Sequence, residues 1–186
     1  PEDIDRAKPL IEKCELIMMQ LEIPMETVIY AARLAKKLGK KVMLNPAPAP
    51  EDGKLPDELF GLIDYFVPNQ TEAELMLGTK IPGKEEAVNA CLDLTDKIKG
   101  LVLITLGEEG VVGMDKDNNP HYMPAFSVNP VDTTAAGDAF LGSLAERITA
   151  GKDIDECLQA ACAAGALATT KKGAQPSLPT RAEIDA

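Results

Sequence analysis

Short apolar runs alternate with longer segments of helical period along the first 105 residues of the chain. Four apolar runs have the length and composition of strands buried in a parallel sheet, and they span 15–20, 41–45, 64–69 and 101–105. Apolar positions spaced three or four residues apart predict helices over 25–39, 71–78 and 84–100. This alternation predicts an α/β fold with a mostly parallel sheet and helices on both faces.

Local signals place the ends of these helices. Lysines fill the last turn of the helix over 25–39, and Gly39 follows them. Thr71 and Glu74 have the spacing of a capping box, which predicts that the next helix begins at Thr71. Gly100 is expected to end the helix over 84–100.

The second part of the chain has a different pattern. Two strand-like runs within 110–126 flank the polar turn 115–119, which predicts a hairpin. Two helices follow, over about 138–150 and 153–170. Because no repeat or linker interrupts the chain, we expect a single domain over 1–186.

Composition narrows the classes of partner. The net charge of −11 argues against nucleic acid and against an anionic membrane surface, and no apolar run is long enough to span a bilayer. A phosphorylated ligand remains compatible, since backbone dipoles and bound cations hold phosphate on acidic proteins. The four cysteines include no C-x-x-C pair, which favours apolar roles in a reducing, cytoplasmic setting.

Polar residues follow the predicted strands, where ligands bind in open α/β sheets. Glu22 follows the first strand, Asn69 and Glu72 follow the third, and the stretch 105–110 follows the fourth. Each one alone also fits an ordinary role, as a solvated acid, a helix cap or a tight turn.

The stretch "DTTAAGDAF", residues 132–140, is more informative. Ala135, Ala136 and Gly137 let a ligand approach the backbone, and their N–H groups would be unpaired donors at the start of a helix. A carboxylate at Asp138 fits a general base beside this anion site. It fits equally a partner for the helix dipole.

This stretch resembles the D-T-x-[GA]-A-G-D signature of the ribokinase-like, or PfkB-type, carbohydrate kinases. The segments "MQLEIP", "NPAPA", "LPDEL", "PNQTEAE", "LITLGEEG", "VDTTAAGDAF" and "TKKGAQPS" follow the order of that family along the whole chain. The resemblance implies a three-layer α-β-α, Rossmann-like fold with a mostly parallel sheet, and phosphoryl transfer from ATP to a sugar hydroxyl.

The resemblance also implies roles for individual residues. Asp138 matches the catalytic base that contacts the sugar, and Glu22 matches an acid that hydrogen-bonds the sugar. The anion hole falls on Ala135, Ala136 and Gly137, and Asn69 with Glu72 would order Mg²⁺ and the phosphates through water. The remaining ATP-binding positions are Thr105, Leu106, Gly107, Glu108, Glu109, Gly110 and Cys162, the last standing where the family often has Asn or His.

A monovalent-cation site, suited to K⁺, is implied as well. The Asp132 carboxylate would supply charge, and most of the other positions would act through backbone carbonyl oxygens. The residues that match this site are Asp132, Thr134, Ala168, Lys171, Gly173 and Ser177.

The resemblance of "GAQPS", "NPAPA" and "QLE" to ribokinase-like stretches implies D-ribose as the sugar, phosphorylated at O5. A fructokinase, a nucleoside kinase and a non-catalytic nucleotide-binding module remain alternatives. The family's first strands, its Gly-Gly sugar motif and its β-sheet lid have no counterpart in this sequence. We therefore expect little or no activity from the chain alone, and a homodimer when the protein is full length.

Overall fold

The computed structural model describes residues 1–186 and contains a six-stranded sheet whose strand order follows the chain, from β1 to β6. The strands are β1 (Leu16–Met19), β2 (Lys41–Leu44), β3 (Tyr65–Phe66), β4 (Leu101–Thr105), β5 (Val111–Met114) and β6 (Pro120–Met123). The α-helices are α1 (Glu2–Ile11), α2 (Met25–Lys37), α3 (Asp57–Phe60), α4 (Gln70–Leu77), α5 (Lys84–Thr95), α6 (Ala136–Thr149), α7 (Ile154–Thr169) and α8 (Arg181–Ile184). Two 3₁₀ turns, η1 (Gly107–Glu109) and η2 (Gln175–Ser177), complete the set.

Strands β1 to β4 are parallel, as the sequence predicts. Met19 is paired with Leu44 across β1 and β2, Leu44 with Phe66 across β2 and β3, and Phe66 with Val102 across β3 and β4. The carboxyl ends of these strands therefore meet at one edge of the sheet. The predicted hairpin is confirmed, because β5 and β6 flank a turn in which the Asp115 carboxylate accepts hydrogen bonds from Asp117 and Asn119.

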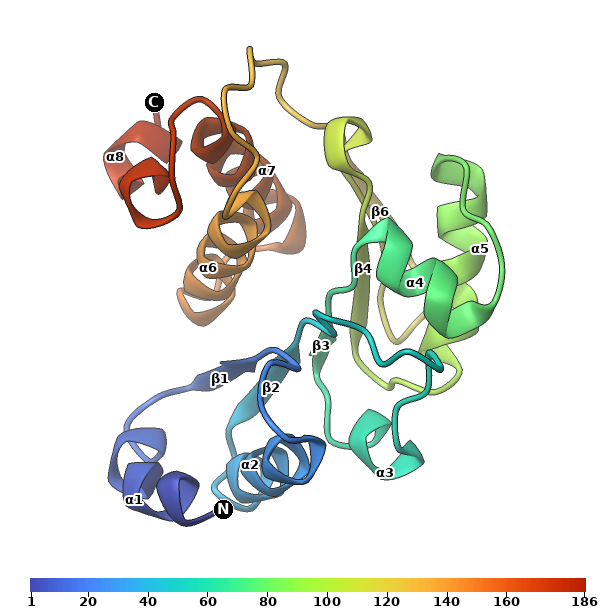
Figure 1. Ribbon diagram of the computed structural model, residues 1–186, viewed down its shortest axis with the longest axis vertical. Helices are drawn as coiled ribbons and strands as arrows, with labels where there is room; N and C mark the ends of the chain where they lie inside the picture. The colour runs from blue at the N-terminus through green and yellow to red at the C-terminus, as the bar shows by residue number, and fades with distance from the viewer. The chain divides into compact units, whose positions relative to one another are not determined.

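The residues form two compact units, 1–106 with 112–121, and 107–111 with 122–186. In the first unit, α2 packs on β1 and β2 while α4 and α5 pack on β4 (Figure 1). Its core is made of fully buried aliphatic and aromatic side chains, among them Leu44, Phe66 and Ile104. The expectation of a single domain over 1–186 stays a prediction.

The second unit is built on the contact between α6 and α7, which lie against each other in Figure 1. Ala139, Ala164 and Ala168 are its buried cluster. A Cβ placed on Gly165 would come within 3.3 Å of the Ala136 carbonyl oxygen, so small residues set how closely the two helices approach. None of the helices is both long and apolar enough to cross a membrane.

The capping box predicted at Thr71 and Glu74 is wrong. The N-cap of α4 is Asn69, whose side chain accepts from the Glu72 N–H at 2.9 Å, while the Glu72 carboxylate accepts from the Asn69 N–H at 2.8 Å. N-x-x-E and T-x-x-E overlap here, and the early end of β3 leaves the chain free to enter the helix at Asn69. Glu74 instead accepts from the Ile81 N–H at 2.9 Å.

Three short or irregular helices escaped the sequence pattern. α3 and α8 span a single turn each, and α1 contains Pro9. The helix predicted over 84–100 ends at Thr95, five residues early. Gly100 does not end it: a Cβ there would lie 2.1 Å from the Asp64 carbonyl oxygen, so close packing of two backbones requires the glycine.

Asp64 ties together the amino ends of β2 and β3. Its carboxylate accepts from Lys36 at 2.8 Å, from Lys41 at 3.0 Å and from the Val42 N–H at 2.9 Å. Burial raises the pKa of this carboxyl, but the three hydrogen bonds together outweigh burial, so the pKa lies below its ordinary 3.8.

We expect Asp64→Asn to lower the free energy of unfolding by about 1 kcal/mol at pH 7, because the charge-assisted hydrogen bonds of the carboxylate are lost while both lysines remain partly hydrated. Since the pKa in the folded state lies below 3.8, this contribution is complete above pH 3.8 and is lost as the pH falls below that value. Urea titrations of both proteins between pH 7 and pH 2 measure the difference.

Glu58→Gln is the matched control, because Glu58 also pairs with a basic residue of α2, Arg33, but is 43% exposed. A difference between wild type and Asp64→Asn that persists unchanged at low pH would contradict the assignment.

Candidate functional site

One group of expected site residues lies at the carboxyl edge of the parallel strands. Asn69 and Thr105 form a parallel bridge, and the Thr105 N–H donates to the Pro68 carbonyl oxygen at 3.1 Å. Leu106 is buried directly after β4. Glu22 lies exposed in the loop after β1 and makes no hydrogen bond or ion pair. The structure therefore brings Asn69, Glu72 and Thr105 together, with Glu22 outside their hydrogen bonds.

Glu72 is a buried carboxylate, with 8% of its surface exposed. Burial raises its pKa, against hydrogen bonds from the Asn69 N–H and from the Asn45 amide that lower it. The Asn69 side-chain amide also donates to it at 2.8 Å. The sequence pattern does not mark Asn45 as a site residue, because "NPAPAP" is typical of a stiff turn. In the structure Asn45 is 9% exposed. An amide placed directly after a buried strand was the available signal.

The chemistry of this carboxylate limits how Mg²⁺ would be held. A carboxylate has about four acceptor positions, and three donors already occupy the Glu72 oxygens, which leaves about one for a water molecule. No group of three or more His, Cys, Asp or Glu side chains could hold a metal ion. The residues fit a Mg²⁺ ion that is carried mainly by phosphate and water, the usual form for this ion.

In the second unit, 107–110 form the turn expected to hold ATP. Gly107 and Gly110 have φ values of +59° and +97°, a region that favours glycine. A Cβ on Gly110 would lie 2.1 Å from the Met123 carbonyl oxygen, so this glycine also permits close backbone packing. Glu108 and Glu109 are exposed within η1.

The "TTAAGD" stretch forms the start of α6, two residues earlier than the sequence pattern predicts. Ala136 is the first helical residue, its N–H donates to the Thr133 carbonyl oxygen at 3.3 Å, and Asp138 stands exposed in the first turn. The expectation of three unpaired N–H groups therefore needs correction at Ala136. Those of Ala135 and Gly137 donate to no other atom of the chain, and nothing lies within 4 Å of a Cβ built on Gly137.

Ala135 is the N-cap of α6 and adopts a left-handed conformation, with φ 62° and ψ 11°. An alanine pays about 1–2 kcal/mol for this conformation, and such outliers concentrate at functional sites. The conformation turns the chain sharply into the helix and leaves the backbone at 135–137 bare of side chains larger than methyl.

Two segments that the resemblance assigns to one cation site lie together in the second unit. The N–H groups of Val131 and Asp132 donate to the Thr169 carbonyl oxygen at 2.7 and 3.1 Å. The Asp132 carboxylate accepts from the Gly173 N–H at 2.9 Å and from the Thr134 N–H at 3.0 Å. Hydrogen bonds from the Thr134 side chain, the Gly173 N–H and the Thr134 N–H lower the pKa of Asp132 to about 2, so it is ionised.

The other members of this expected cation site lie on the same two segments. Ala168 and Ser177 are fully buried, and the Ser177 hydroxyl donates to the Ala174 carbonyl oxygen at 2.7 Å. The Lys171 ammonium points to Glu183, at 3.0 Å. One ionised carboxylate beside two turns rich in carbonyl oxygens suits a hard monovalent ion, and the assignment of Asp132, Thr134, Ala168, Lys171, Gly173 and Ser177 to it stays a prediction.

Cys162 is buried in α7, and its thiol faces the Met123 carbonyl oxygen at 4.0 Å. Burial raises its pKa to about 12. A neutral thiol is a weak donor, so this position offers less to a nucleotide than Asn or His would. Its contact with ATP stays a prediction.

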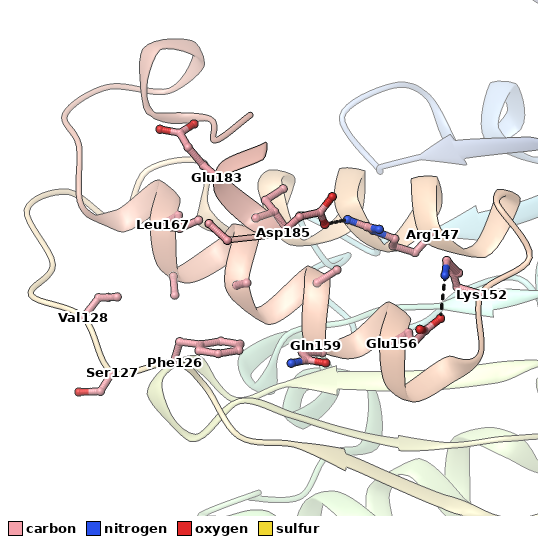
Figure 2. A pocket seen from close by; sticks show the side chains of 15 residues that line it. Phe126, Ser127, Val128, Arg147, Lys152, Glu156, Gln159, Leu167, Glu183 and Asp185 are labelled. Carbon is pink, nitrogen blue, oxygen red and sulfur yellow. Dashed lines mark hydrogen bonds and ion pairs between the residues drawn. The ribbon is translucent and has the colours of Figure 1, made fainter. Parts of the chain in front are cut away.

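A separate cleft of about 580 Å³ lies in the second unit, between α6, α7, α8 and the loop 126–128 (Figure 2). None of the expected site residues lines it. Four of its charged side chains form pairs, Arg147 with Asp185 and Lys152 with Glu156 at 3.2 Å, while Glu183 pairs with Lys171 outside the lining.

Known proteins resemble this chain over nearly its full length. The family model described as "pfkB family carbohydrate kinase" matches residues 7–181. A ribokinase of Haemophilus influenzae is 42% identical over 180 residues, and a deoxyribokinase of Salmonella typhi is 41% identical over 180 residues; each match covers 97% of this chain and 58% of the relative. The chain thus spans about 58% of the length of these curated relatives.

Solved structures agree with the fold. The structure of Arabidopsis thaliana ribokinase complexed with ribose and ATP has a TM-score of 0.89 at 31% identity, covering 97% of this chain and 57% of that one. The mostly parallel sheet flanked by helices therefore matches the ribokinase-like α/β fold.

Thiol reactivity tests the burial of Cys162. Burial raises the pKa of Cys91 and Cys162 to about 12 and that of Cys157 to about 11, whereas Cys14 is only partly buried. Because thiolates are the reactive species, we expect iodoacetamide at pH 8 to modify one thiol quickly in the folded protein and four in denaturant. Mass spectrometry counts the additions, and Cys14→Ser should abolish the fast one. Fast labelling of Cys162 would contradict this picture.

Proposed function

Because the chain belongs to the pfkB family of carbohydrate kinases, we propose that it is part of a kinase that transfers the γ-phosphoryl group of ATP to O5 of D-ribose, giving ADP and D-ribose 5-phosphate. The observation that carries the proposal is the position of Asp138, in the first turn of α6 beside backbone N–H groups that have no partner in the chain. A carboxylate and an anion site placed together match the two needs of phosphoryl transfer to an alcohol.

Asp138 takes the proton from the sugar hydroxyl as the oxygen of that hydroxyl attacks the γ-phosphorus of ATP. The N–H groups of Ala135 and Gly137, with the positive end of the α6 dipole, stabilise the negative charge on the transferred group. The bare backbone at Gly137 leaves room for the phosphoryl oxygens. Asp138 remains exposed in this chain, as a base that must reach a substrate would be.

The other expected residues hold the nucleotide and its ions. Asn69 and Glu72 order the waters of Mg²⁺ and the phosphates, and the turn 105–110 holds ATP. Mg²⁺ held there would supply positive charge that offsets part of the negative charge of the phosphates. Asp132 and the turn 168–177 would hold K⁺, and Asp132 lies close in sequence to the start of α6. The ion would supply positive charge that strengthens the field at the anion site.

2-Deoxy-D-ribose is a second candidate substrate and should be tested beside D-ribose. The deoxyribokinase of Salmonella typhi is as similar to this chain as the ribokinase of Haemophilus influenzae, at 41% and 42% identity. The two substrates differ by one hydroxyl, and a site that hydrogen-bonds this hydroxyl rejects the analogue strongly. The full-length protein should be assayed for ADP release with D-ribose and 2-deoxy-D-ribose, and with fructose and adenosine as controls for the other sugar and nucleoside kinases.

Release of ADP with none of these acceptors would favour a non-catalytic nucleotide-binding module. We further propose a homodimer in the cytoplasm for the full-length protein, and sedimentation tests the dimer.

In the full-length protein, we expect Asp138→Asn to lower kcat by about 10²–10⁴, because the amide cannot accept the hydroxyl proton. ATP binding should persist, since the N–H groups at the start of α6 remain. Stopped assays for ADP give kcat, and calorimetry gives the affinity for ATP. Asp155→Asn is the matched control, because Asp155 stands in the first turn of α7.

If Asp138 served only the helix dipole, both substitutions would instead cost about 0.3–1 kcal/mol of stability and leave kcat intact.

K⁺ should activate the full-length enzyme. At matched ionic strength, we expect kcat/KM to be several times higher in KCl than in tetramethylammonium chloride, because carboxylate and carbonyl oxygens coordinate a small hard ion and not a bulky organic one. Asp132→Asn should remove the difference between the salts. Equal activity in both salts for the wild type would refute the cation site.

A further inference from the structure

Four polar or charged residues are buried in the whole chain, and two of them, Asn45 and Glu72, touch each other. The Asn45 amide donates to the Val67 carbonyl oxygen at 2.8 Å and to the Glu72 carboxylate at 3.4 Å. Burying such groups is unfavourable unless each finds a partner. The partners of Asn45 therefore show what holds the carboxylate in place.

The oxygen of the Asn45 amide, Oδ1, accepts a hydrogen bond from the side-chain amide of Gln20 at 3.1 Å. The orientation of Asn45 is forced, since its NH₂ group faces two acceptors and its oxygen must then face a donor. Gln20 supplies this donor. A carboxylate at position 45 would face the Val67 carbonyl and the Glu72 carboxylate with no proton to offer.

These three residues follow three neighbouring strands. Gln20 comes directly after β1, Asn45 directly after β2, and Glu72 lies in the first turn of α4, which follows β3. Backbone bonds run alongside, from the Asn45 N–H to the Met19 carbonyl oxygen at 3.0 Å and from the Leu21 N–H to the Ala47 carbonyl oxygen at 2.9 Å. The chain of contacts thus continues the parallel ladder beyond the strand ends.

We propose that Gln20 and Asn45 are positioning residues: through the contact series Gln20–Asn45–Glu72 they hold the Glu72 carboxylate in the orientation in which it serves the Mg²⁺-nucleotide. This inference rests on the role proposed above for Asn69 and Glu72. Gln20 contacts Asn45, and it acts by fixing the Asn45 amide.

The experiment uses the full-length protein and Gln20→Met, which keeps the side-chain length and removes the donor. Calorimetry measures the affinity for ADP over a series of Mg²⁺ concentrations, a readout that needs no turnover. We expect the Mg²⁺ concentration for half-maximal binding to rise about fivefold, the effect of losing one hydrogen bond. ADP affinity in the absence of Mg²⁺ should stay unchanged.

Gln70→Met is the matched control, because Gln70 is a partly buried amide on α4 that donates to the Ile81 carbonyl oxygen at 2.7 Å, outside this contact series. It tests whether loosening α4 is enough to change the Mg²⁺ dependence. We expect its melting temperature to fall by about as much as that of Gln20→Met, with the Mg²⁺ dependence of the wild type. An equal shift in Mg²⁺ dependence for both variants would overturn the proposal.

A double variant tests the route through Glu72. Glu72→Gln alone should raise the Mg²⁺ requirement, and adding Gln20→Met should raise it no further, because coupled residues do not contribute additively. Additive effects would overturn the proposal. Asn45→Asp should raise the Mg²⁺ requirement at least as much as Gln20→Met does, and a wild-type requirement in that variant would also overturn it.

The outcomes separate this inference from the proposed function. A wild type that binds Mg²⁺ and ADP but phosphorylates no sugar overturns the proposed activity, and the binding series still decides the role of Gln20. A wild type whose ADP binding does not depend on Mg²⁺ overturns the inference and the assigned role of Glu72 together.

Discussion

The parallel pairing of β1 to β4 is the constraint on which the nucleotide side of the candidate site depends. Parallel strands must all end at the same edge, and their connections must return along the faces of the sheet. Residues from positions 20 to 105 are thereby brought to one edge without any local sequence signal that joins them. The polar groups found there, Asn45 and Glu72 above all, are buried because the next strand always lies beside them.

Burial of a carboxylate is unfavourable, and the fold offsets it with donors from three directions. Glu72 receives the N–H of its own helix cap, the side-chain amide of that cap and the amide of Asn45. The capping box has two uses here, since it starts α4 and it also fixes a charged group at the edge of the sheet. Asn69 can therefore be a helix cap and also, as the resemblance implies, part of a motif that orders Mg²⁺ through water.

The start of α6 is built differently from the edge of the sheet. Its residues are small, one of them is held in a left-handed conformation, and α7 approaches closely because Gly165 has no side chain. Such a start contributes little packing energy, and its stability comes from the long contact between α6 and α7. Backbone N–H groups, rather than side chains, are what this segment presents. The segment lies within residues 7–181, which match the family model.

The sequence by itself determined the strands, the hairpin, the two long final helices and the family, because these rest on local periodicity and on contiguous motifs. It also singled out Asn69, Glu72, Asp132 and Asp138, which stand within such motifs. Only the tertiary structure decided which residue caps α4, that Gly100 is a packing glycine, and that Asp132 reaches the Gly173 N–H across 41 positions. The same holds for Gln20 and Asn45: each is an ordinary polar residue after a strand, and its partners become neighbours only when the parallel strands pair.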